Sequence, residues 1–206
     1  QSLYEQGHIT YMRTDSFTLS EDALSQLETY IKDNYGEEYY KRREYKDNKE
    51  SSQEAHEAIR PTAVGEPPEL NDPAEAKLYK LIRDRTLASQ MTREDLMNFE
   101  LLIENSAYEN LFKSKFQETV FQGFTIVYDK KKVIPPEVTA LKKGDTIKYS
   151  QIVAEQEYSK PKNLRYTEAN LIKHLDKLEI GRPSTYSNMV SVVQDRKYVE
   201  KRDLEG

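Results

Sequence analysis

A tyrosine with an arginine and several hydroxyl-bearing side chains close behind it lies near the start of the chain. Tyr11 sits in a short β-prone stretch and is followed by Arg13, Thr14, Asp15 and Ser16. Attack of a phenol, whose free pKa is about 10, on a phosphodiester needs nearby positive charge to stabilise the phenolate and the transition state. On an extended segment, Arg13 shares a face with Tyr11 and can reach the same phosphate. Spacing alone favours a simpler interpretation, a buried tyrosine beside a surface arginine.

A histidine and an arginine four residues apart form the second candidate. If the segment around them is helical, His56 and Arg60 lie on one face, where imidazole and guanidinium make a phosphate-binding pair. A metal site is disfavoured, because the stretch has one histidine and Glu54 and Glu57 do not repeat its face well. A structural or surface histidine is the alternative.

The third candidate is a turn between two predicted helices near the end of the chain. It carries Arg182, Ser184 and Thr185, and Tyr186 follows in the second helix. Hydroxyls and backbone amides at a helix N-terminus, with an adjacent arginine, form an anion site. Simple capping, with Ser184 as N-cap after Pro183, is the alternative, and both roles can coexist.

Helices that position these residues are predicted from caps and apolar spacing. Ser20 caps a helix that Gly36 ends, and Asn71 or Asp72 caps one that starts at Pro73 and reaches about residue 90. In that helix, Leu78, Leu81 and Ile82 lie on one side. Thr167 caps a helix with an apolar stripe to Leu178, and a second helix runs over about 185–196 to give a helix-turn-helix pattern. Residues 37–53 are interpreted as an exposed loop.

The middle of the chain changes to a strand-like pattern. The segments with this character are 99–103, 112–116, 120–128 and 146–153. We therefore predict an α+β fold in three parts: a helical domain with Tyr11 at 1–97, a β-rich antiparallel segment at 98–159, and a partial helix-turn-helix-like domain at 160–206.

Composition limits the class of protein and its partners. The 206 residues allow one or two domains. The absence of cysteine excludes disulfides and cysteine-based zinc sites in this sequence. No apolar run approaches the length needed to span a membrane. The first residues read as the middle of a helix, so we expect the chain to begin inside a larger protein. The net charge of −5 argues against nucleic acid, but residues 160–202 hold ten basic and five acidic residues and form a local basic region.

Taken together, three ordered blocks resemble the type IA DNA topoisomerases. Segment 9–16 (ITYMRTDS) resembles the family's active-site signature, and 53–62 (QEAHEAIRPT) resembles a second block. A third block comprises 165–172 (RYTEANLI), 180–186 (IGRPSTY) and 194–196 (QDR). Met12 and the His56 block place the sequence nearer the bacterial topoisomerase I branch than the topoisomerase III branch, with reverse gyrase as a close relative.

The resemblance implies a mechanism and roles for these residues. Tyr11 would attack single-stranded DNA to form a 5′-phosphotyrosyl link, and strand passage and resealing would relax negative supercoils without ATP. Arg13 would position and neutralise the scissile phosphate, and His56 would hydrogen-bond a nearby phosphate. Residues implied in DNA binding are Arg60, Arg182, Ser184, Thr185 and Tyr186. The helical part would correspond to the family's CAP-like domain and the β segment to the arch of its gate.

The resemblance also implies what lies elsewhere. The Toprim domain, whose acidic cluster binds Mg²⁺, has no matching block here, and neither do the zinc ribbons. We therefore expect no metal or cofactor within this chain, a cytoplasmic, nucleoid-associated monomer, and no membrane partner. The isolated chain is expected to bind single-stranded DNA weakly and neither cleave nor relax it. The alternatives are a non-catalytic helix-turn-helix DNA-binding module, which leaves the Tyr11 block unexplained, and a structural or protein-interaction domain.

Overall fold

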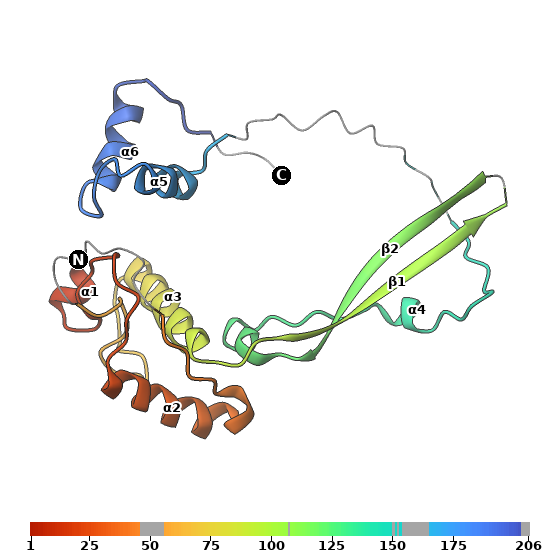
Figure 1. The fold of residues 1–206 in the computed structure, drawn as a ribbon, viewed down its shortest axis with the longest axis horizontal. Helices are drawn as coiled ribbons and strands as arrows, with labels where there is room; N and C mark the ends of the chain where they lie inside the picture. Colours follow the sequence, from red (N-terminus) through yellow and green to blue (C-terminus); the bar gives the residue numbers. More distant parts are fainter. Residues whose placement is uncertain (46–55, 107, 150, 152, 154–164, 203–206) are drawn as a thin grey trace. The chain divides into compact units, whose positions relative to one another are not determined.

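The computed structural model describes residues 1–45, 56–106, 108–149, 151, 153 and 165–202. The chain divides into two compact units, Gln1–Asp145 and Thr146–Gly206, which are described separately. Helices and an antiparallel sheet share the chain, so the predicted α+β class is confirmed (Figure 1). The three-part domain division stays a prediction, and its 159/160 boundary lies outside the described residues, as do Glu54 and residues 46–53 of the predicted loop.

The first unit begins with helices whose limits follow their capping residues. The helices are α1 (Ser2–Glu5), α2 (Glu21–Tyr35), the 3-10 helix η1 (Glu37–Tyr39) and α3 (Pro73–Ser89). The Ser20 hydroxyl accepts a hydrogen bond from the Ala23 amide, and the Asp72 carboxylate accepts one from the Ala74 amide. Gly36 ends α2 with φ of 110°, a left-handed-side conformation that glycine adopts without strain. These caps confirm the predicted helix starts.

Two apolar clusters hold these helices together. In the larger one, α2 contributes Leu27 and Ile31 and α3 contributes Leu87, with Val64 and Met91 completing the set. The smaller cluster joins Leu3, Ile9 and Tyr79 and anchors the segment that leads to Tyr11. Leu78 and Leu81 of α3, which share a side with Ile82, are instead 47% and 61% exposed. The buried side of α3 is therefore the one that carries Tyr79 and Leu87.

Replacing Leu27 by alanine tests this core. Leu27 is fully buried, so removing its side chain is expected to cost about 2–5 kcal/mol of unfolding free energy through lost burial and a residual cavity. Urea unfolding of this chain, followed by circular dichroism, measures the change. The matched control is Leu81→Ala on exposed α3 surface, where a change within about 0.5 kcal/mol is expected. Equal effects of the two substitutions would contradict the assigned core.

Two long strands follow the helices. β1 (Asp95–Asn105) and β2 (Tyr108–Phe121) pair antiparallel, with Phe99 opposite Phe116 and Ile103 opposite Phe112. Figure 1 shows them as an extended two-stranded ribbon. The strands predicted at 99–103 and 112–116 are confirmed and are longer than expected.

The other two predicted strands are wrong within the described residues. β2 ends at Phe121, and the 3-10 helix η2 (Gly123–Tyr128) replaces the strand expected to 128. Gly123 has φ of 49°, and a β-carbon there would lie 2.3 Å from the Arg93 carbonyl oxygen, so only glycine permits this close approach. Phe124 of η2 then packs on the larger apolar cluster. The described residues of 146–153 lie in no strand, and α4 (Pro136–Thr139) precedes them.

Among its described residues, the second unit has two helices joined by a short turn. α5 (Glu168–Lys177) starts at Thr167, whose hydroxyl accepts a hydrogen bond from the Asn170 amide, as predicted. α6 (Tyr186–Asp195) follows the turn, and its Val190 is buried. The Tyr186 hydroxyl donates to the Asp176 carboxylate across 3.0 Å and so ties the two helices together. Helix, turn and helix are arranged as the sequence predicts.

Candidate active site

Backbone pairing brings the Tyr11 and His56 blocks together. Ile9 and Pro61 form an antiparallel bridge, and the Thr10 amide donates to the Arg60 carbonyl across 2.9 Å. The Thr10 hydroxyl donates to the Ala58 carbonyl at 2.7 Å and accepts from the Arg60 amide at 2.9 Å. Residues 9–10 and 58–61, about fifty residues apart in sequence, are therefore held side by side by hydrogen bonds.

The Tyr11 ring contacts two other aromatic rings. The Tyr4 ring lies edge-on at 5.3 Å between centroids, and the His56 ring lies edge-on at 6.0 Å. Tyr11 is nevertheless 44% exposed. Its ring is thus positioned by contacts on the protein side and accessible from solvent, which a nucleophile requires and a buried core tyrosine would not show.

The Asp15 carboxylate links Arg13 and His56. Asp15 Oδ2 accepts from Arg13 Nε at 2.9 Å, and Asp15 Oδ1 accepts from His56 Nε2 at 2.8 Å. The other ring nitrogen of His56, Nδ1, faces the Glu57 carbonyl oxygen at 2.9 Å. Both partners are oxygen acceptors, so a protonated His56 ring satisfies both contacts, whereas a neutral ring can donate to only one of them.

The pKa directions agree with this arrangement. The hydrogen bond to the Glu57 carbonyl, followed by the one to Asp15, raises the pKa of His56 above 6.5 against the opposing effect of burial. Burial pushes the pKa of Asp15 upward, but the hydrogen bonds from His56 and Arg13 outweigh it and hold that pKa below 3.8. Both shifts favour the charged forms, a protonated His56 and an ionised Asp15, next to the Arg13 guanidinium.

A phosphate oxygen can replace the Asp15 carboxylate as the acceptor of the hydrogen bonds from Arg13 and His56. Both are anionic oxygen acceptors, and guanidinium and imidazolium donors bind either. A phosphate that displaces Asp15 would meet Arg13 and His56 together, beside an exposed phenol. The arrangement is therefore suited to neutralise a phosphodiester next to a tyrosine nucleophile.

An NMR titration of His56 tests the linked pair. The midpoint is expected above 6.5 in this chain, and Asp15→Asn is expected to move it downward because the carboxylate no longer favours the charged ring. A wild-type midpoint at or below 6.5 would contradict the arrangement. Because the folded-state pKa is raised, the stability that His56 contributes is complete below its unfolded pKa and is lost as pH rises through the folded value.

Arg60 lies in a different place from the one that the sequence suggests. Residues 56–62 form no helix, so His56 and Arg60 do not share a helical face. Arg60 is 9% exposed, and its guanidinium donates from Nε to Glu57 at 2.8 Å and from Nη1 to the Pro61 carbonyl at 3.0 Å. Glu57 also accepts from the Ser20 amide at 3.0 Å. Direct DNA contact by Arg60 stays a prediction, and its burial indicates a positioning role.

Glu57 is the residue that connects Arg60 to the start of α2. Burial raises its pKa, but the hydrogen bond from Ser20 and the charge of Arg60 outweigh burial and lower the pKa overall. The ionised Glu57 side chain therefore connects the start of α2 to Arg60, while its carbonyl holds His56. Asp15 and Glu57 were assigned no functional role from the sequence, although both lie inside the blocks that resemble the family.

The third predicted group lies in the second unit. The Thr185 hydroxyl accepts from the Arg182 amide at 2.8 Å and donates to the Arg182 carbonyl at 3.0 Å. Thr185 is the N-cap residue of α6, so the assignment of Ser184 as the cap is wrong. Arg182, Ser184 and Thr185 are exposed, as an anion contact requires, whereas Tyr186 is partly buried. Their DNA contacts stay predictions.

The described residues do not fit a magnesium site. No group of three or more histidine and acidic side chains among them is arranged to hold a metal ion. Asp15 and Glu57, the carboxylates of the site, are each committed to cationic side chains. Among the described helices, none is both long and apolar enough to cross a bilayer.

An exposed tyrosine beside a histidine and an arginine that share one carboxylate is an arrangement that can bind and attack a phosphate. The family model described as DNA topoisomerase matches residues 1–205, so the chain belongs to the DNA topoisomerase family. Within this family, the chain belongs with the bacterial type IA topoisomerases I. Its relatives include DNA topoisomerase 1 of Rickettsia felis, 42% identical over 94% of this chain, and of Salmonella typhimurium, 41% identical over 97%.

The same comparisons show how much of the relatives the chain covers. It covers 26% of the Rickettsia felis protein and 26% of a prokaryotic-type DNA topoisomerase 1 from Acanthamoeba polyphaga mimivirus, which is 39% identical over the whole chain. The structure of full-length topoisomerase I from Thermotoga maritima matches 95% of this chain with a TM-score of 0.71 and 34% identity. The chain covers 32% of that structure. It thus spans about a quarter to a third of the proteins that it matches.

Proposed function

We propose that this chain supplies the nucleophile and phosphate-binding cations of a type IA topoisomerase that relaxes negatively supercoiled DNA without ATP. The observation that carries the proposal is the Asp15 carboxylate held between Arg13 and His56, beside the exposed Tyr11 ring. This is a preformed anion position next to a phenol. The family membership supports DNA as the source of the phosphate.

The proposed chemistry is a reversible exchange of ester oxygens on phosphorus. The Tyr11 oxygen forms a bond to phosphorus, the bond to the deoxyribose 3′-oxygen breaks, and the phenol loses a proton while the leaving oxygen gains one. Arg13 and His56 neutralise the phosphate as charge develops on it. The 3′-hydroxyl then attacks the phosphotyrosine in the reverse step. The number of phosphate ester bonds is unchanged, so no nucleotide hydrolysis is needed.

The remaining assignments complete the proposal. The substrate is a single-stranded segment of negatively supercoiled DNA, and Arg182, Ser184 and Thr185 contact the same strand. Mg²⁺, which the family resemblance implies, is bound by acidic residues outside this chain. The full-length protein that contains this chain acts as a monomer in the cytoplasm, associated with the nucleoid. By itself the chain neither cleaves nor relaxes DNA, and robust relaxation of plasmid by the purified chain with Mg²⁺ would refute that assignment.

Salt-dependent binding tests the phosphate site in this chain. Affinity for oligo-dT, measured by fluorescence anisotropy, is expected to fall with salt, and Arg13→Ala is expected to reduce the slope of log K against log salt by about 0.7. The control is Lys113→Ala on the ribbon, where Lys113 already pairs with Glu100 and no change in slope is expected. An unchanged slope in Arg13→Ala would remove Arg13 from the phosphate site.

A further inference from the structure

We propose that the first unit contains a nucleobase pocket beside the Tyr11 loop, which holds a base of the strand that stays attached to Tyr11. The proposal rests on the proposed function, because it takes single-stranded DNA as the ligand. The pocket has a volume of about 500 Å³, within the range of sites that bind small organic groups. It lies among the 14–19 segment, residues 43–45, the C-terminal part of α3 and Phe124.

Two exposed aromatic rings line this pocket. Phe17 is 58% exposed and Tyr45 is 43% exposed. The Tyr45 hydroxyl donates to the Ser89 carbonyl at 3.1 Å, which fixes the ring against the end of α3. Unstacked bases bind to such rings regardless of sequence, because every base has a π-face. Ala58, Ile59 and Ala88 add apolar contacts on the remaining walls.

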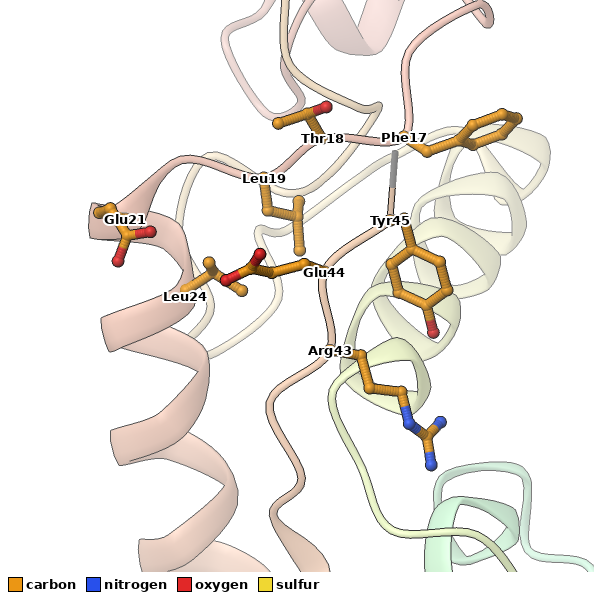
Figure 2. Close-up of a pocket in the computed structure, with 8 residues that line it drawn as sticks. All are labelled: Phe17, Thr18, Leu19, Glu21, Leu24, Arg43, Glu44 and Tyr45. Carbon is orange, nitrogen blue, oxygen red and sulfur yellow. The ribbon is translucent and has the colours of Figure 1, made fainter. Parts of the chain in front are cut away.

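Two arginines give the pocket a charge that suits a nucleotide. Arg43 and Arg85 line it, and neither guanidinium forms an ion pair with the part of the chain that the structure describes. Figure 2, which shows the adjoining pocket, has the side chains of Arg43 and Tyr45 directed toward α3 and that of Glu44 directed toward α2. Arg43 and Arg85 thus line the 500 Å³ pocket, while the acidic side chain of Glu44, between Arg43 and Tyr45 in the sequence, points toward α2.

The backbone that presents Arg43 and Tyr45 is fixed in advance. Buried Gln90 accepts from the Arg43 amide at 2.9 Å and donates to the Arg43 carbonyl at 3.0 Å. This paired contact fixes the backbone at residue 43, and Arg43 and Tyr45 both line the pocket. The Tyr45 ring and the backbone that carries Arg43 are therefore placed before a ligand arrives, which lowers the ordering cost of binding.

The pocket lies near Tyr11 in the sequence of the same unit. Thr14 and Ser16, from the polar run after Tyr11, form part of its wall. Thr14 is three residues from Tyr11, so their α-carbons are at most about 11 Å apart. Cleavage that leaves the 5′-phosphate on Tyr11 keeps the downstream strand on this unit. A base site on the same unit would hold that strand in place until the 3′-hydroxyl returns.

Comparison of base-bearing and abasic ligands tests the pocket in this chain. The ligands are 5′-phosphorylated dT₄ and the matching abasic tetranucleotide, competed against a fluorescent oligo-dT. The wild-type chain is expected to prefer dT₄ by about tenfold, and Phe17→Ala and Tyr45→Ala are each expected to remove most of that preference. Tyr45→Phe keeps the ring and is expected to retain it. Tyr149→Ala, which removes an exposed ring of the second unit, is the control and is expected to leave the preference unchanged.

The outcomes separate this pocket from the proposed function. Equal, salt-dependent binding of both tetranucleotides by the wild-type chain would overturn the pocket and leave the phosphate site standing. A preference for dT₄ that survives both Phe17→Ala and Tyr45→Ala would overturn the assignment of these rings. Failure of the wild-type chain to bind either ligand or oligo-dT would count against the DNA function of the site itself.

Discussion

Tyr11→Phe in a full-length topoisomerase containing this chain is expected to abolish DNA cleavage and relaxation. The substitution removes only the phenolic oxygen, which forms the bond to phosphorus, so no covalent intermediate can form. Removal of a nucleophile typically reduces the rate by on the order of 10⁴-fold or more. The measurement is the amount of covalent protein–DNA complex trapped by denaturant, together with plasmid relaxation.

Tyr4→Phe is the matched control for that experiment. Tyr4 is a neighbouring tyrosine of similar exposure whose ring packs edge-on against Tyr11. Its substitution likewise removes one hydroxyl and keeps the ring, so activity is expected to stay close to wild type. Substantial cleavage by Tyr11→Phe, or equal loss in both variants, would contradict the assignment of Tyr11 as nucleophile.

Arg13→Ala in the same full-length protein is expected to slow single-turnover cleavage by about 10²- to 10³-fold. Removal of one preorganised charge that stabilises a transition state has an effect of this size. Because the Arg13 guanidinium also pairs with Asp15, the alanine variant leaves that carboxylate with His56 alone. Loss of charge stabilisation and added repulsion of the phosphate then act in the same direction.

Arg13→Lys distinguishes charge from geometry. Lysine keeps the positive charge but lacks the planar fork of donors, so partial recovery of the cleavage rate is expected. Cleavage by Arg13→Ala within a fewfold of wild type, at saturating DNA, would show that Arg13 does not act on the transition state. A change confined to DNA affinity would limit its role to binding.

Local signals predicted much of the fold. Ser20, Asp72 and Thr167 are good caps in the sequence, and each accepts the expected backbone amide. The alternation in 99–103 and 112–116 indicated strands that pair in the structure. These features depend on neighbours a few residues away, so sequence patterns are sufficient to predict them.

Features that depend on distant contacts were not predictable in this way. The chain leaves β2 at Gly123, where the Arg93 carbonyl lies so close that no β-carbon would fit. Phe124 then packs on the apolar cluster of α2 and α3 instead of continuing the strand. The side of α3 that is buried is likewise chosen by its partners, since Leu78 and Leu81 are as apolar as the buried Leu87. Tertiary contacts override local preference in both cases.

The candidate site shows the same division. Recognition of the blocks predicted that Tyr11, Arg13 and His56 act together, and the structure brings these three side chains into one cluster. The mediating role of Asp15 depends on its meeting His56, 41 residues away, and no local pattern indicates that contact. The helical spacing of His56 and Arg60 was misleading, because residues 56–62 form no helix and Arg60 instead pairs through its backbone with Thr10.

Peptide mapping of the covalent complex tests the central claim most directly. A full-length topoisomerase containing this chain would be trapped on a single-stranded oligonucleotide labelled at its 3′ end, digested with protease and nuclease, and sequenced by mass spectrometry. The labelled downstream strand is expected to remain linked through its 5′-phosphate to the peptide that contains Tyr11. A phosphodiester link to any other residue, or retention of the upstream strand on the protein, would contradict the account.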